Sequence, residues 1–227
     1  MKRALLALLA FGVAVTAAPV DARETPRERR EREAKEARQR AGDLVKPCTD
    51  AVSASKWDDV IDKCTKLIDS KGLEGEDLGQ IYLARGNAYR NKDDCAKAMS
   101  DLDAAKPLRP ADFQIPLLQY ICAVKLKDDA KASAALDDGL TLAPDNQDML
   151  RARCVLRVNA KTFATAIPDC EKVIAANPND KDILTVLGQM YETEKQTDKA
   201  KATYTQLLSV DPGNTVATDG LKRLGGK

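Results

Sequence analysis

Proline recurs at a fixed interval through the second half of this chain. Pro110, Pro144, Pro178 and Pro212 each lie 34 residues after the one before. Each follows a segment of small and apolar residues and stands in a short turn sequence, which is LRPAD, LAPDN, ANPND or VDPGN. Because proline disrupts a helix interior, each turn separates two helical units. A period of this length, repeated four times, predicts an all-α solenoid of stacked units.

Small and large residues keep the same places within each unit. When the units are counted from residues 79 and 181, Gly86 and Gly188 fall at position 8, and Tyr89 and Tyr191 fall at position 11. Alanine recurs at position 20, as Ala98, Ala132, Ala166 and Ala200. The small residues allow two antiparallel helices to approach closely, and the larger ones fill the space between them. This pattern resembles the tetratricopeptide repeat (TPR) family over about residues 41–214.

The resemblance implies an all-α, right-handed superhelical solenoid of about five helical hairpins plus a C-terminal capping helix. One hairpin cannot bury its apolar face alone, so successive hairpins must stack. The expected units are 41–74, 79–112, 113–146, 147–180 and 181–214, and residues 215–227 are expected to form the capping helix and tail.

Residues 1–22 have the plan of a secretory signal peptide. Lys2 and Arg3 precede an apolar run that ends near Val15, and small residues follow, with cleavage expected near Ala17 or after Ala22. The apolar run is too short to span a bilayer, because spanning takes roughly 20 residues. We therefore expect a periplasmic or secreted protein that is soluble after cleavage, with no transmembrane segment in the mature chain.

Residues 23–40 form a charged arm with eight basic and five acidic residues. Such a segment has good helix propensity but no apolar face. It is predicted to be a solvated, partly helical arm, since runs of mixed charge are usually solvated. The alternative is that it contacts an anionic surface such as lipid headgroups.

Composition restricts the function further. The chain has 36 lysines and arginines against 35 acidic residues, so it has no general attraction for nucleic acid. It has no histidine, which is the commonest general base and metal ligand, and no C-x-x-C spacing. We expect no catalysis, no metal and no cofactor. A hydrolase without histidine would need serine–lysine or carboxylate chemistry.

The six cysteines suggest pairing in an oxidising compartment. In two of the pairs, the cysteines occupy positions 8 and 24 of the same unit. These two positions are equidistant from the turn of the hairpin and therefore lie opposite each other. The third pair spans the turn at Pro110. The expected structural disulfides are Cys48–Cys64, Cys95–Cys122 and Cys154–Cys170. Buried free thiols are the alternative, and a thiol-redox protein that uses one pair is the alternative function.

In the TPR family the first helix of each unit lines a concave face. The candidate groove residues are the apolar Leu83, Leu117, Leu118, Ile121, Val124, Val155, Val158 and Val186, with the polar Asn87, Arg151 and Gln189 beside them. An aliphatic strip of this size suggests an interaction surface for an amphipathic helix or an apolar peptide. The alternative is that curvature of the superhelix, or the arm folding back, buries part of it.

The resemblance implies a non-catalytic scaffold that binds a protein or peptide partner of the cell envelope in this groove. Some relatives bind a free peptide carboxyl terminus with lysine and asparagine at positions 2 and 6. Here those positions hold other residues, including Gln80, Ala84, Gln114 and Leu118. Recognition of a free carboxyl terminus is therefore not expected.

Overall fold

The computed structural model describes residues 24–225, and the predicted signal peptide lies outside this range. The described residues form eleven helices and no strand. The helices are α1 (Pro26–Ser53), α2 (Trp57–Asp69), α3 (Gly75–Asn91), α4 (Cys95–Ala105), α5 (Gln114–Lys125), α6 (Asp129–Leu142), α7 (Gln147–Asn159), α8 (Phe163–Ala176), α9 (Lys181–Thr193), α10 (Thr197–Val210) and α11 (Thr215–Arg223).

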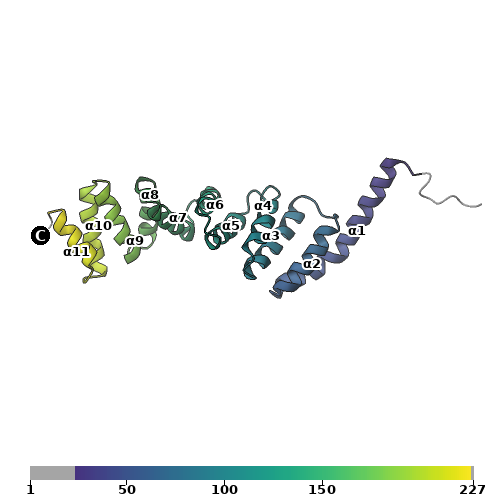
Figure 1. Ribbon diagram of the computed structural model, residues 1–227, viewed down its shortest axis with the longest axis horizontal. Helices are drawn as coiled ribbons and strands as arrows, with labels where there is room; N and C mark the ends of the chain where they lie inside the picture. The colour runs from purple at the N-terminus through teal and green to yellow at the C-terminus, as the bar shows by residue number, and fades with distance from the viewer. Residues whose placement is uncertain (1–23, 226–227) are drawn as a thin grey trace, which may run out of the picture.

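Consecutive helices pair into five hairpins, which are α1/α2, α3/α4, α5/α6, α7/α8 and α9/α10. The second helix of each hairpin packs on the first helix of the next, and α11 packs on α9 and α10. Figure 1 shows the helices in chain order along the long axis, with α1 at one end and α11 at the other. The expected solenoid of five hairpins and a capping helix is confirmed.

The turn inside each hairpin after the first uses one backbone device. Asp93, Lys127, Lys161 and Lys195 have φ between 57° and 63°, and they recur at the same interval as the prolines. A left-handed residue there ends the first helix of the hairpin and redirects the chain into the second. The left-handed backbone conformation thus repeats with the same period as the prolines in the sequence.

The turn between hairpins depends on the residue that follows each proline by two. Asn146, Asp180 and Asn214 are the N-caps of α7, α9 and α11, and each side chain accepts a hydrogen bond from a backbone N–H in the first turn. A short polar side chain satisfies a donor that the helix itself leaves unpaired. At these three turns the proline and its capping residue therefore fix where the next helix starts, whereas the N-cap residue of α5, after Pro110, makes no side-chain capping hydrogen bond.

Close helix contact depends on glycine at position 8. A Cβ placed on Gly188 of α9 would lie 2.5 Å from the ring of Tyr204 in α10. The Tyr204 ring is fully buried, and a Cβ on Gly220 of α11 would lie 2.3 Å from the same ring. Tyr204 is thus held between two glycines, and it joins the last hairpin to the capping helix.

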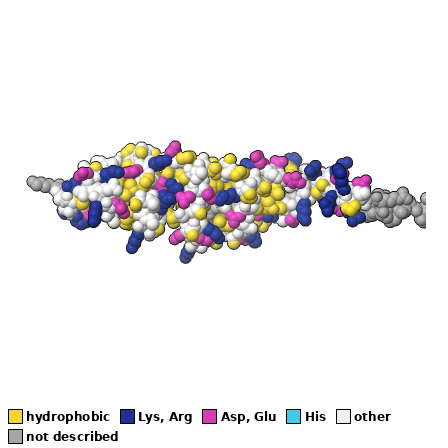
Figure 2. All heavy atoms as spheres, turned by 90° about the horizontal axis from the view of Figure 1, so that it is seen from above, with side chains coloured by type: hydrophobic (Ala, Val, Ile, Leu, Met, Phe, Trp, Pro, Cys, Tyr) yellow, Lys and Arg dark blue, Asp and Glu magenta, His cyan; other side chains and the backbone are white. Residues whose placement is uncertain are grey.

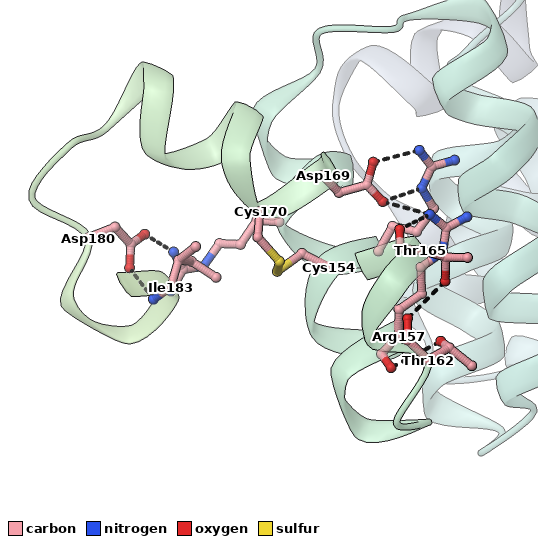
Figure 3. The surroundings of a disulfide bond; sticks show 10 residues. Cys154, Arg157, Thr162, Thr165, Asp169, Cys170, Asp180 and Ile183 are labelled. Carbon is pink, nitrogen blue, oxygen red and sulfur yellow. Dashed lines mark hydrogen bonds and ion pairs between the residues drawn. A yellow bond between two sulfur atoms is a disulfide. The ribbon is translucent and has the colours of Figure 1, made fainter. Parts of the chain in front are cut away.

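Buried ion pairs link the two helices of the second and fourth hairpins. Arg85 donates to Asp101 at 2.7 and 2.8 Å, and Arg153 donates to Asp169 at the same distances. Arg157 also donates to Asp169, at 3.0 Å. Figure 3 shows Asp169 beside Cys170, with guanidinium groups directed at its two oxygens. Each carboxylate is nearly inaccessible to solvent, so it depends on these donors.

The charged arm differs from the expectation of a partly helical segment. It forms the start of α1, which runs unbroken from Pro26 into the first hairpin and begins with a capping box between Thr25 and Glu28. Residues 25–36 are exposed, whereas Ala37 is buried and packs beside Gly72. Figure 1 shows α1 projecting beyond α2, so the described part of the arm does not fold back over the array.

Candidate functional site

Two disulfides each join the two helices of a single hairpin. Cys48 and Cys64 join α1 to α2 with an S–S distance of 2.08 Å, and Cys154 and Cys170 join α7 to α8 with 1.99 Å. All four residues are fully buried. Each bridge connects positions 8 and 24 of a single unit, where the two helices come closest.

The third expected disulfide, between Cys95 and Cys122, is absent from the structure. Both residues are buried free thiols that belong to the same small apolar cluster. Cys95 begins α4 and Cys122 lies in α5, so they belong to neighbouring hairpins and their separation depends on how hairpins stack. The other two pairs come together because both cysteines are equally far from the turn of one hairpin. That rule does not apply to Cys95 and Cys122.

The chemistry of Cys122 does not favour a redox role for this residue. Burial, together with the interaction with the neighbouring Cys95 thiol, raises the pKa of Cys122 to about 12. The thiolate is the reactive form of cysteine, and it is almost unpopulated near neutral pH when the pKa is this high.

The structure divides the candidate groove residues between two pockets. The first, which we call the neutral pocket, is about 300 Å³ and lies between α1, α3 and α5. Its lining residues are Val52, Gln80, Leu83, Ala84, Asn87, Gln114, Leu117 and Leu118. None of them is ionisable, so this pocket fits an uncharged group.

The second pocket, which we call the acidic pocket, is about 480 Å³ and lies between α5, the start of α6 and α7. Its lining residues are Tyr120, Val124, Asp129, Asp148, Arg151, Ala152, Val155, Leu156 and Asn159. The candidate residues Val124, Arg151 and Val155 meet here. Val124 is 48% exposed and Val155 is 42% exposed, so this pocket presents aliphatic surface to water.

Other candidate residues contribute less to an open groove. Leu83 is a core residue, because it is only 4% exposed and packs with Leu102, Ala105 and Ile115. The residues Ile121, Val158, Val186 and Gln189 line neither pocket. Val158 and Val186 are half-buried against the core of the last three hairpins. The stacking of hairpins therefore buries part of the predicted strip.

Around the acidic pocket, the basic side chain is paired with carboxylates, whereas the two acidic lining residues are unpaired in the described part of the chain. Arg151 is bound by Asp180 and lies 3.3 Å from Asp182, so its guanidinium is engaged within the protein. Asp129 and Asp148 are exposed, and neither forms an ion pair within residues 24–225. The rim therefore carries carboxylates that have no internal partner.

The face seen in Figure 2 shows hydrophobic side chains over the middle of the array and mostly charged side chains where α1 projects. Among the described residues, no group of three or more cysteine, aspartate or glutamate side chains could hold a metal ion. None of the helices within residues 24–225 combines the length and the apolar character that a membrane span requires.

Comparison with known proteins agrees with this architecture. Residues 158–223 match the tetratricopeptide repeat family model. Residues 158–223 therefore carry the sequence pattern of the tetratricopeptide repeat, and the array of five stacked hairpins shares the fold of solved tetratricopeptide-repeat structures. No curated protein matches it in sequence.

Solved structures share the fold at low sequence identity. YrrB, described as a TPR protein with an unusual peptide-binding site, is 15% identical with a TM-score of 0.61, over 79% of this chain and 90% of that one. MamA AMB-1 is 15% identical with a TM-score of 0.62, over 79% and 96%. A tetratricopeptide repeat protein from Parabacteroides merdae ATCC 43184 is 15% identical with a TM-score of 0.60, over 82% and 72%.

Proposed function

We propose that this protein is a non-catalytic periplasmic scaffold that binds a segment of an envelope partner on the face formed by its first helices. The observation that carries the proposal is the acidic pocket, where Val124 and Val155 remain about half exposed in the centre of the array. Burying such aliphatic surface against a partner is favourable, at about 25 cal/mol per Å². The neutral pocket adds a second apolar site on the neighbouring hairpin.

Two observations support a location outside the cytoplasm. Four of the six cysteines are in disulfides, and disulfides persist mainly in oxidising compartments. Residues 1–22 have the plan of a signal peptide. The two features are independent, since one concerns the folded array and the other the start of the chain.

The fold supports a partner that is a protein or peptide. TPR arrays present extended surfaces made by successive hairpins. YrrB, which shares this fold, is described as having a peptide-binding site. The residues that bind a free carboxyl terminus in some relatives are absent here, so we propose that an internal segment of the partner is bound.

The proposal is tested by affinity capture from a periplasmic extract with the wild-type protein and with Val155→Asp. Placing a carboxylate in the apolar floor of the pocket should abolish retention of the partner. Leu142→Asp is the matched control, because Leu142 is 41% exposed but lies at the end of α6, outside both pockets. Retention of every partner by Val155→Asp would refute the proposal.

A further inference from the structure

The two pockets on the first helices differ in charge, and this difference specifies a ligand. The lining of the neutral pocket contains no ionisable residue. The acidic pocket has Asp129 and Asp148 at its rim, and its one basic lining residue, Arg151, is already bound by Asp180 and Asp182. The Arg151 guanidinium is thus paired with two carboxylates outside the lining, and the two lining carboxylates are not paired with it.

Two lysines near the acidic pocket are paired with carboxylates outside its lining. Lys125, which follows Val124, is bound by Asp93. Lys131 on α6 lies 3.4 Å from Asp128. The free carboxylates at the rim therefore attract a cation from outside the protein.

The floor of the acidic pocket suits the stem of a long basic side chain. Val124, Val155 and Leu156 supply apolar surface in the same lining as the two carboxylates. Lysine and arginine lay their methylene groups along such surface and keep the charged end at a polar rim. We propose that the acidic pocket binds a lysine or arginine side chain of the partner segment, and that the neutral pocket binds an aliphatic side chain of the same segment. This inference rests on the proposed scaffold function.

The structure also sets the spacing of these two side chains. Both pockets use α5, with Leu117 and Leu118 in the neutral pocket and Val124 in the acidic one. Six residues of helix, from Leu118 to Val124, rise about 9 Å, and neighbouring helices lie about 10 Å apart. The pocket centres are therefore roughly 13 Å apart, which an extended peptide covers in about four residues. The expected motif is an aliphatic and a basic residue separated by three others.

The experiment uses synthetic fluorescein-labelled peptides with leucine and lysine in this spacing, made in both sequence orders. Matched peptides carry glutamate in place of lysine, or one residue between leucine and lysine in place of three. Binding to the full array is measured by fluorescence anisotropy at low and high salt. One order of the lysine peptide should bind at least about fivefold more tightly than its glutamate partner, and salt should reduce the difference.

Variants connect the preference to the rim. Asp148→Asn combined with Asp129→Asn should remove most of the preference for lysine, and Asp148→Lys should reverse it. Both residues are exposed, so folding should be retained, which the helical circular dichroism signal checks. Asp62→Asn, at an exposed position on α2, is the control and should change nothing.

The outcomes separate this inference from the scaffold function. Equal binding of the lysine and glutamate peptides, with both lost in Val155→Asp, would refute the charge assignment and leave the scaffold standing. A preference for lysine that persists in Asp148→Lys would also refute it. Absence of binding by every peptide would refute the inference, and capture with Val155→Asp then decides the scaffold function separately.

Discussion

Substituting alanine for Gly188 should destabilise the protein even though alanine is the better helix former. The added methyl group would lie 2.5 Å from the ring of Tyr204, whereas ordinary contact begins near 3.4 Å. The ring cannot move away, because a Cβ on Gly220 would lie 2.3 Å from its other edge. Its hydroxyl group also donates to Glu192 at 2.8 Å, which fixes the far end of the side chain.

The expected magnitude combines two opposed effects. Overpacking of a rigid core costs about 1–3 kcal/mol. Replacing glycine by alanine inside a helix recovers about 1 kcal/mol. The free energy of unfolding should therefore fall by up to about 2 kcal/mol. Truncating the ring with Tyr204→Ala should make the second substitution, Gly188→Ala, favourable.

The assay is urea denaturation followed by the helical circular dichroism signal. Gly42→Ala is the matched control, since Gly42 lies inside α1 with no other atom within 4 Å of the added methyl. That variant should be about 1 kcal/mol more stable than the wild type. If Gly188→Ala stabilises the protein as Gly42→Ala does, the proposed rigid contact with Tyr204 does not exist.

Three further changes test other parts of the array. Cys154→Ala should lower the free energy of unfolding by about 3 kcal/mol, because it removes the disulfide that closes a loop between two cysteines with a sequence separation of 16. An unchanged denaturation midpoint would contradict this. Asp169→Asn should cost about 2–3 kcal/mol, because it leaves two partly buried guanidinium groups with only the exposed carboxylate of Asp137. Asp62→Asn in an exposed pair should cost less than about 0.5 kcal/mol, and similar midpoints for both would refute the role of burial. The Arg223 guanidinium lowers the pKa of Glu192 below its ordinary 4.5. The stability that this pair contributes is complete above about pH 4.5 and is lost as the pH falls through the lowered pKa, so the melting temperature should fall in acid and should fall less in Glu192→Gln.

Much of the fold follows from the sequence because each unit repeats its own boundaries. The evenly spaced prolines predict where hairpins end, and the structure places N-caps at Asn146, Asp180 and Asn214, two residues after three of them. Position 8 predicts close helix contact, which Gly188 makes with Tyr204. These features are local, so spacing along one chain is enough to find them.

The buried ion pairs carried a signal that the sequence interpretation did not use. Arg153 and Asp169 each directly precede a cysteine of the disulfide in their unit, so they share its sequence separation of 16. Arg85 and Asp101 repeat this interval two units earlier. Opposite charges at positions 7 and 23 would have predicted both contacts.

Contacts between hairpins could not be predicted in the same way. Leu83 and Val155 both lie on first helices, but Leu83 is 4% exposed and Val155 is 42% exposed. The difference arises because Ile115 of the next unit packs on Leu83. The state of Cys95 and Cys122 has the same origin, since it depends on the distance between two hairpins. The spacing of residues within one unit does not determine these distances.

Both disulfides lie within a single hairpin, and none of the cysteines at residues 48–170 joins one hairpin to another. A stretching force on the two ends would therefore be resisted at the junctions by side-chain packing, hydrogen bonds and ion pairs, and by neither disulfide. In the first and fourth hairpins, the residues between the two bonded cysteines could not be extended after the other hairpins had unfolded. Each of these loops would shorten the fully extended chain by roughly 50 Å. Under a stretching force, the two disulfides would limit the maximum extension of the chain, and a reducing agent would remove that limit.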